Sequence, residues 1–447
     1  MFIPRLKTCT LTADLPPATA LVPSLLTQIG TADIPDIYRR FAHVVGAKHW
    51  KHRVTQMRAA IKGNHALTHY LHNENDIAFG LQRCNDLIER YGRLPSDLEA
   101  TRTLYPAISF AAQTLSMMEL ATRVEAERLR KRVEGALKNP NDMRALRLEL
   151  STATHFARRG CRLEWPEMTD GGTFDLLVPD AGSSGLEVEC KSVSDDKGRN
   201  IHRREALDFH HLLVNELGAI RKNLIVGLAV VLTLPDSLPT RHKEREALAK
   251  RVRQQISIGH GSQFDDGSDI RITEFDLGRL GNVANDNRPE VVREIVENVT
   301  GTQNREAMLI GTEKGGALAF VVQSVVNDDF LGATFRTLGD AAKRQLTGRR
   351  PGVLIAGFDG LDGEQLLSIA GQDNDPQQPP TALAIRVSRF LSSDSRDNVV
   401  GVGFLSRGAL RPVTDGIVDS GGTAYYFPKR ASPFWHDDFS GLFTARS

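Results

Sequence analysis

Residues 171–191, GGTFDLLVPDAGSSGLEVECK, contain two short β-type runs on either side of a turn region rich in proline, glycine and serine. The runs cover residues 174–178 and 186–193, and runs bounded by such turns predict strands. Pairing of the two strands would bring Asp175 beside Glu189. The stretch therefore predicts a hairpin with a carboxylate on each strand.

The second run predicts a strand with one charged face. Successive side chains of a strand point to opposite sides, so Glu187, Glu189 and Lys191 are expected on the same face. The other face, expected to point into a core, consists of Leu186, Val188 and Cys190. Glu187 is interpreted as an exposed strand residue in preference to a base near the site.

Asp175, Glu189 and Lys191 together have the chemistry of a site for metal-dependent hydrolysis of phosphodiesters. Carboxylate oxygens are the ligands that hard divalent cations prefer, and such a cation activates water and stabilises charge on a phosphate. A lysine beside the carboxylates can position or deprotonate the attacking water. Because charged and apolar residues also alternate in ordinary half-exposed strands, the surrounding sequence has to support this interpretation.

A helix is predicted upstream, over residues 142–159, where apolar residues recur at roughly helical spacing. Glu149 lies near the middle of this helix, and Gly160 is suited to follow its end. The predicted order is a helix with Glu149, a strand, the two strands of the hairpin and another helix.

This order resembles the PD-(D/E)xK nuclease superfamily, most closely its branch of archaeal Holliday-junction resolvases and Mrr-type restriction endonucleases. Residues 160–165, GCRLEW, resemble the segment that follows the glutamate-bearing helix of that branch. Residues 171–175, GGTFD, resemble the segment with the metal-binding aspartate, with Thr-Phe-Asp in place of Pro-Asp. Residues 189–191 resemble the Glu-x-Lys element. The similarity covers residues 142–235, and no glutamine signature of the Mrr branch is obvious after Lys191.

The resemblance implies a role for each residue of the hairpin and the helix. Asp175, Glu189 and the carbonyl of Cys190 would bind Mg²⁺ or Mn²⁺, Lys191 would be the catalytic lysine, and Glu149 an accessory acid. The implied activity is that of an endonuclease acting on nucleic acid, DNA rather than RNA, in bacterial phage defence or DNA repair. A homodimer or partner proteins of a defence system fit the same setting.

The expected fold class is α/β, with a restriction-endonuclease-like core in which helices flank a mixed sheet. Residues 1–140 predict a mostly helical region, which ends at the breaker and helix cap in residues 139–142, NPND. Residues 141–288 predict the nuclease-like domain, and the apolar run at 223–234 is expected to complete its sheet. Residues 289–447 predict an α/β domain for substrate selection or assembly.

Nucleic-acid binding has to come from local clusters, because the net charge of the chain is only +1. The basic residues that follow the hairpin are Lys197, Arg199, Arg203 and Arg204. They are suited to phosphate contacts, and a solvated loop is the equally supported alternative. The helix predicted at 123–138 mixes acids and bases in a way that favours a solvated face.

The composition is typical of a globular cytoplasmic protein. The four cysteines are widely spaced, which argues against a zinc ribbon or a disulfide scaffold and fits a reducing compartment. No apolar run is long enough to predict a membrane span. His65, His69 and His72 fall on one helix face, where a solvent-facing surface is favoured over a metal site.

Two alternatives to a nuclease remain at this point. A non-catalytic nucleic-acid-binding or scaffold protein would have the same fold with a vestigial site. An enzyme of another class, such as a metal-dependent hydrolase of a small phosphoester, would use the same ligands. The joint presence of Asp175, Glu189 and Lys191 favours the nuclease, since a decayed site usually lacks one such residue.

Overall fold

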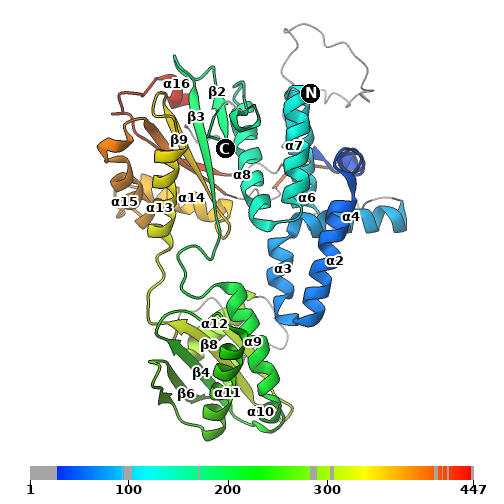
Figure 1. The fold of residues 1–447 in the computed structure, drawn as a ribbon, viewed down its shortest axis with the longest axis vertical. Coiled ribbons are helices and arrows are strands. Elements are labelled where there is room, and N and C mark those ends of the chain that lie inside the picture. The colour runs from blue at the N-terminus through cyan, green and yellow to red at the C-terminus, as the bar shows by residue number, and fades with distance from the viewer. Residues whose placement is uncertain are drawn as a thin grey trace.

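The computed structural model describes residues 28–92, 94, 103–169, 172–281, 289–302, 307–406, 411–414, 416–419 and 422–443. Figure 1 shows two lobes joined by two stretches of chain. The first lobe is made of the described residues in 28–193 and 330–443, and the second lobe of those in 203–324. The stretches that join them, residues 194–202 and 325–329, are called the linkers below.

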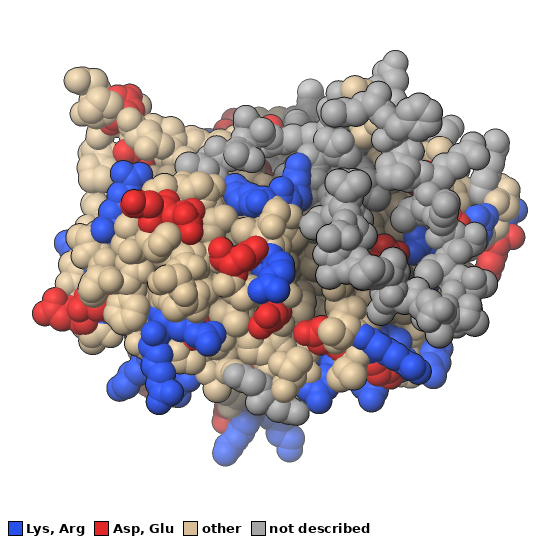
Figure 2. Space-filling view, turned by 90° about the horizontal axis from the view of Figure 1, so that it is seen from above, with Lys and Arg blue, Asp and Glu red and all other residues tan. Residues whose placement is uncertain are grey.

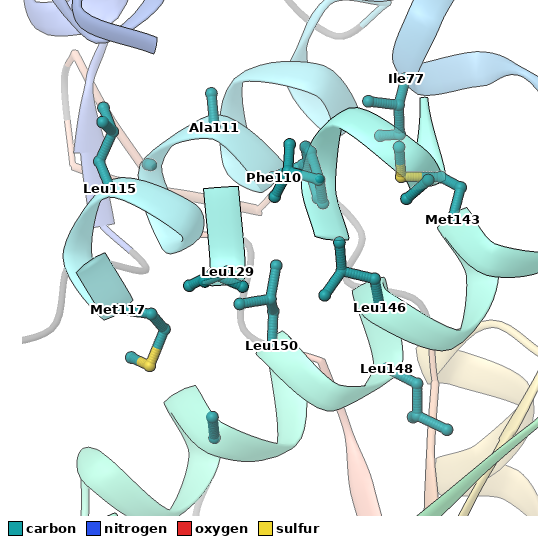
Figure 3. Close-up of a cluster of buried hydrophobic side chains, with 14 of the residues drawn as sticks. Ile77, Phe110, Ala111, Leu115, Met117, Leu129, Met143, Leu146, Leu148 and Leu150 are labelled. Atoms are coloured by element: carbon teal, nitrogen blue, oxygen red, sulfur yellow. The ribbon is translucent and has the colours of Figure 1, made fainter. Parts of the chain in front are cut away.

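The first lobe begins with a helical region, as predicted. Its α-helices are α1 (Ile34–Phe41), α2 (Lys48–Gly63), α3 (Thr68–Glu74), α4 (Asp76–Tyr91), α6 (Tyr105–Leu120), α7 (Arg123–Ala136) and α8 (Pro140–Ala157). Apolar side chains of α4, α6, α7 and α8 meet in one core (Figure 3). The cap predicted for α8 is present, because the Asn139 side chain accepts a hydrogen bond of 3.0 Å from the amide of Asn141.

The first lobe also contains a five-stranded mixed sheet. Its strands, in spatial order, are β13 (Ala424–Pro428), β10 (Val399–Leu405), β9 (Gly352–Phe358), β3 (Leu186–Val193) and β2 (Leu176–Val178). β3, β9 and β10 run parallel, and the two outer strands are antiparallel to their neighbours. α8 packs on one face, and α13 (Phe330–Arg344) and α15 (Ala382–Leu391) pack on the other. α14 (Gly363–Asn374) and α16 (Asp438–Leu442) complete this lobe.

The second lobe is built on another five-stranded mixed sheet. In spatial order the strands are β5 (Ser262–Gln263), β6 (Asp269–Phe275), β4 (Gly227–Leu234), β8 (Ala317–Ser324) and β7 (Ala307–Gly311). α9 (Arg203–Glu216) and α11 (His242–Ile258) contribute to the core on one face, while α12 (Pro289–Thr300) packs on the other. α10 (Gly218–Asn223) connects α9 to β4. A separate small sheet joins β1 (Gln28–Gly30), β12 (Ile417–Asp419) and β11 (Arg411–Thr414).

The sheet pairing corrects two sequence-based expectations. The apolar run at 223–234 was expected to complete the nuclease-like sheet, but it forms β4 at the centre of the second sheet. Its place beside β3 is taken by β9, from the region expected to form a separate C-terminal domain. An apolar run indicates that a strand is buried on both faces, but it does not identify the neighbouring strand. Residues 223–234 and 352–358 are both apolar, so either run could be expected beside β3. The second lobe is therefore an insertion between β3 and α13.

The two linkers are hydrogen-bonded to each other where they cross. The amide of Asp329 donates to the Gly198 carbonyl at 2.9 Å, and the side chain of Asn200 donates to the Val326 carbonyl at 2.9 Å. Gly198 has φ +70°, and a Cβ there would lie 2.4 Å from the Asp329 carbonyl oxygen. Glycine is needed at this crossing for both reasons.

None of the helices in the described part of the chain combines the length and the apolar character that a membrane crossing requires.

Candidate active site

The structure brings Asp175 and Glu189 together across the hairpin. β2 and β3 are antiparallel, with Leu176 opposite Val188, and one further step along this register places Asp175 opposite Glu189. The Asp175 Oδ2 atom accepts a hydrogen bond of 2.7 Å from the amide of Cys190. Both carboxylates are buried. The hairpin thus delivers the two acids to one place, as the pattern of residues 171–191 predicts.

Lys191 lies on the same face of β3 and donates a hydrogen bond to Oε1 of Glu189. Burial lowers the pKa of Lys191, but the negative charges of Glu189 and Asp175 outweigh this effect and leave the pKa raised. Lys191 is therefore an ammonium group at neutral pH. It is suited to orienting a water molecule or stabilising negative charge, and unsuited to deprotonating water.

Glu149 approaches the pair from α8 and is held by Arg132 of α7. The Arg132 guanidinium donates a hydrogen bond of 2.7 Å to Oε1 of Glu149. Burial, together with the negative charge of Asp175, raises the pKa of Glu149 to about 8, although Arg132 opposes the shift. Arg132 was not among the predicted site residues. A signal for it exists in the sequence, because it follows Leu129 by three residues and so adjoins the buried stripe of α7.

The other two carboxyl groups also ionise less readily than in water. Burial and the negative charge of Asp175 raise the pKa of Glu189 to about 8, against the effect of Lys191. Burial raises the pKa of Asp175 to about 6, although the Cys190 amide and the Lys191 ammonium lower it. Desolvation and mutual repulsion of like charges have this effect wherever carboxylates share a buried site. The strongest shifts of this kind concentrate at functional sites.

Glu167 is a further acid at this site that the sequence did not single out. It lies in the short 3-10 helix Pro166–Met168, is exposed, and contributes to the raised pKa of Asp175. Arg128 of α7 donates a hydrogen bond to the carbonyl of Met168 and so ties this turn to the helix. Four carboxylates, those of Glu149, Glu167, Asp175 and Glu189, therefore face two cations, Arg132 and Lys191.

These residues have the donor chemistry for a divalent cation. Oε2 of Glu149 and Oε2 of Glu189 are buried without a hydrogen-bond partner, and buried charge of this kind favours a cation or a proton. Among the described residues, no three His, Cys, Asp or Glu side chains form a ready metal-ligand group. Mg²⁺ does not require one, since it keeps several waters and is bound through one or two carboxylates.

Cys190 can contribute only its backbone to such a cation. Its thiol lies on the opposite side of β3, 3.5 Å from the Thr152 hydroxyl. Burial and the nearby Asp175 carboxylate raise the thiol pKa well above its usual value. Because a thiol binds metals as the thiolate, the backbone carbonyl is the relevant donor.

The expectation that Glu187 is an exposed strand residue is wrong. Its side chain is fully buried, and it accepts hydrogen bonds of 2.8 Å and 2.5 Å from the amide and hydroxyl of Thr347. Alternation along a strand shows which residues lie on the same face, but it does not show whether another part of the chain covers that face. Here the segment between α13 and β9 covers it.

The predicted phosphate-binding residues lie in the first linker and at the start of α9. Arg199 has a side chain only 7% exposed and pairs with Asp196 at 3.3 Å. Arg204 is half exposed and lies 3.7 Å from Asp208. Lys197 is half-buried, as is Arg203, whose amide donates to Asp196 at 2.9 Å. A role of this group in binding nucleic acid stays a prediction.

The three histidines on α3 and its approach are exposed, as favoured from the sequence. His65 lies in the 3-10 turn before α3, and His72 stacks on Phe79 with ring centroids 3.9 Å apart. More generally, Figure 2 shows basic and acidic side chains interspersed on the face that it presents. This mixture agrees with the small net charge of the chain.

Comparison of the chain with family models, with curated proteins and with solved structures gave no match.

Proposed function

We propose that the protein is a metal-dependent nuclease that hydrolyses phosphodiester bonds of nucleic acid, DNA rather than RNA. The observation that carries the proposal is the position of Asp175 opposite Glu189, with Lys191 beside them on β3. These residues supply two carboxylate ligands and one fixed positive charge at a single place. The resemblance to the PD-(D/E)xK superfamily supports the same activity from the sequence.

Asp175, Glu189 and the carbonyl of Cys190 would hold Mg²⁺ or Mn²⁺. A bound divalent ion would lower the pKa of a water molecule and stabilise the charge that develops on the phosphate. The two unpartnered carboxylate oxygens and the raised pKa values of the carboxyl groups favour such a ligand. Glu149, which Arg132 fixes in place, adds a further carboxyl group at the same site.

The chain's own residues would then perform two tasks. The Lys191 ammonium would orient the attacking water and stabilise the additional negative charge of the transition state. Glu149, with a pKa near 8, can accept or release a proton at neutral pH. Bacterial phage defence or DNA repair in the cytoplasm, with a homodimer or defence partner proteins, is the setting that the resemblance suggests.

A non-catalytic nucleic-acid-binding or scaffold protein is the second candidate. It is favoured by the ion pair between Lys191 and Glu189, which occupies one carboxylate oxygen. In such a protein the site would be a remnant of the fold.

Incubation with Mg²⁺ or Mn²⁺ and with plasmid, linear DNA, single-stranded DNA and RNA separates the two candidates. The nuclease is expected to cleave DNA only when the ion is present. Calorimetric titration with Mn²⁺ should detect binding that Asp175→Asn removes and Asp269→Asn, an exposed aspartate of β6, retains. Unchanged binding in Asp175→Asn would contradict the assignment and direct the search to His65, His69 and His72.

A further inference from the structure

A cleft of about 580 Å³ lies against β2, beside the candidate active site. Phe174 and Glu187 line it, and each is a close neighbour of a catalytic candidate. Phe174 directly precedes Asp175, and Glu187 is two residues from Glu189 on the same face of β3, about 7 Å along the strand. Asp175 and Glu189 are not among the lining residues of the cleft, but they adjoin two of them along the chain.

Two arginines, Arg349 and Arg350, also line the cleft. They lie in the segment between α13 and β9, where Arg349 is exposed and Arg350 half-buried. Neither has an ion-pair partner among the described residues, whereas Arg144 and Arg147 of the same lobe are both paired with acids. Glu164 and Glu187 line the same cleft, but neither forms an ion pair with these arginines in the described part of the chain. Guanidinium groups without such a partner are suited to binding phosphates.

The segment with these arginines is fixed by the buried carboxylate of Glu187. Glu187 accepts both hydrogen bonds that Thr347 donates from its amide and hydroxyl, and its own amide donates to the Pro351 carbonyl at 2.9 Å. The Thr347 hydroxyl oxygen in turn accepts a hydrogen bond of 3.2 Å from the amide of Arg349. β3 thus positions the carboxylate of Glu189 and, through Glu187, the backbone beside the arginines.

We propose that this cleft binds the phosphates of the nucleic-acid strand next to the bond that is cleaved. Arg349 and Arg350 would contact the phosphates, and Glu187 would be a positioning residue for both. The inference rests on the proposed nuclease function and names how the substrate reaches that site. It assigns the phosphate contacts nearest the cleaved bond to Arg349 and Arg350. The basic residues that follow the hairpin, Lys197, Arg199, Arg203 and Arg204, would lie farther away along the strand.

Fluorescence anisotropy with short labelled DNA, single-stranded and duplex, tests the cleft in Ca²⁺ so that binding is measured apart from cleavage. Arg349→Gln with Arg350→Gln should weaken binding at least about tenfold. It should also reduce the slope of log K against log salt by about 2. The matched control is Arg386→Gln with Arg389→Gln, two exposed arginines of α15, which packs on β10 away from β2. Equal affinity and slope in the cleft variant and the wild type would overturn the inference.

A second pair of variants tests the positioning role of Glu187 without changing any charge. Thr347→Val removes the hydroxyl donor to Glu187, whereas Thr347→Ser keeps it. Weaker binding in the valine variant with recovery in the serine variant supports the role, and equal binding in both contradicts it. Loss of binding in the double arginine variant supports the cleft even if the wild type cleaves nothing. The proposal for the cleft and the proposal of a nuclease can therefore be contradicted independently of each other.

Discussion

β3 in the first lobe and β4 in the second lobe have neighbours of the same orientation, although β3 lies next to the edge strand β2 and β4 is the central strand of its sheet. Each pairs antiparallel with one neighbour, β2 or β6, and parallel with the other, β9 or β8. β4 reads GLAVVLTL and has no ionisable side chain. β3 reads LEVECKSV and has two fully buried glutamates and a lysine.

The comparison of β3 with β4 shows that a buried strand with such neighbours does not need ionisable side chains. A buried carboxylate costs several kcal/mol unless hydrogen bonds or opposite charges compensate it, and β4 forms the same kind of strand without one. Glu187 is compensated by Thr347 and has a structural role. Glu189 retains an unpartnered oxygen. Residues whose burial the fold does not explain are candidates for function.

The largest expected effect comes from comparing two shortened chains, one that cuts through the first lobe and one that lacks the second lobe. A chain that ends at Asn287 lacks β9 and β10, so β3 loses its parallel neighbour and the first lobe should not fold. The expected loss is the whole stability of a typical domain, about 5–15 kcal/mol. Joining Asn200 to Val326 by a short Gly–Ser linker removes the second lobe instead and should leave the first lobe folded.

Circular dichroism and thermal unfolding distinguish these outcomes. The shortened chain without the second lobe should show one cooperative transition, with a small loss of stability. That loss would arise where α9 contacts the helical region, for example at the 3.2 Å hydrogen bond from Asn64 to Asp208. A cooperative transition in the chain that ends at Asn287, or none in the chain without the second lobe, would contradict the division into lobes.

The charged side chain of β3 with the largest expected effect on rate is Lys191. Lys191→Ala should reduce cleavage by about 10²–10⁴, the usual loss for one positioned catalytic group. The affinity for DNA should change little, because binding depends on many phosphate contacts. Lys51→Ala is the matched control, since Lys51 also pairs with a glutamate, Glu89, but lies exposed on α2. Cleavage by Lys191→Ala at the wild-type rate would end the catalytic assignment.

The sequence predicts local features of this protein well and long-range pairing poorly. The helical N-terminal region, the start of α8 and the hairpin that joins Asp175 to Glu189 follow from periodicity, capping and alternation within short windows. The pairing of β3 with β9 does not, because more than 150 residues separate them and several apolar runs are equivalent as partners. Arg132 and Glu167 escaped notice because their place at the site depends on how α7 and a 3-10 turn pack.

Metal binding should distinguish β3 from β4 through pH. Cation binding requires ionised carboxylates, whereas burial and mutual repulsion raise the pKa values of Asp175 to about 6 and Glu189 to about 8. Protons therefore compete with the metal below these values. The stabilisation by Mn²⁺ should grow as pH rises from about 6 to about 8, and reach about 2.7 kcal/mol at 100 times Kd.

Thermal unfolding at several pH values, with and without Mn²⁺, measures this effect. Asp175→Asn should abolish the increment at every pH, and Asp269→Asn should preserve it. A stabilisation that does not depend on pH, or that persists in Asp175→Asn, would show that the ion binds elsewhere.

The smallest effect concerns the stability of the metal-free protein. Since the folded-state pKa of Asp175 is raised from 3.8 to about 6, its contribution to stability is complete below about pH 4 and is lost as pH rises through about 6. Asparagine does not titrate and does not repel Glu149 or Glu189. Asp175→Asn should therefore gain stability over the wild type across that range, by about 1–2 kcal/mol at neutral pH.

Asp269→Asn, at an exposed position beside β4, should stay within about 0.5 kcal/mol of the wild type. Chemical denaturation without metal at several pH values gives both differences. If Asp175→Asn were the less stable variant at neutral pH, the buried carboxylate would be a structural element of β3, and the contrast with β4 would lose its functional meaning.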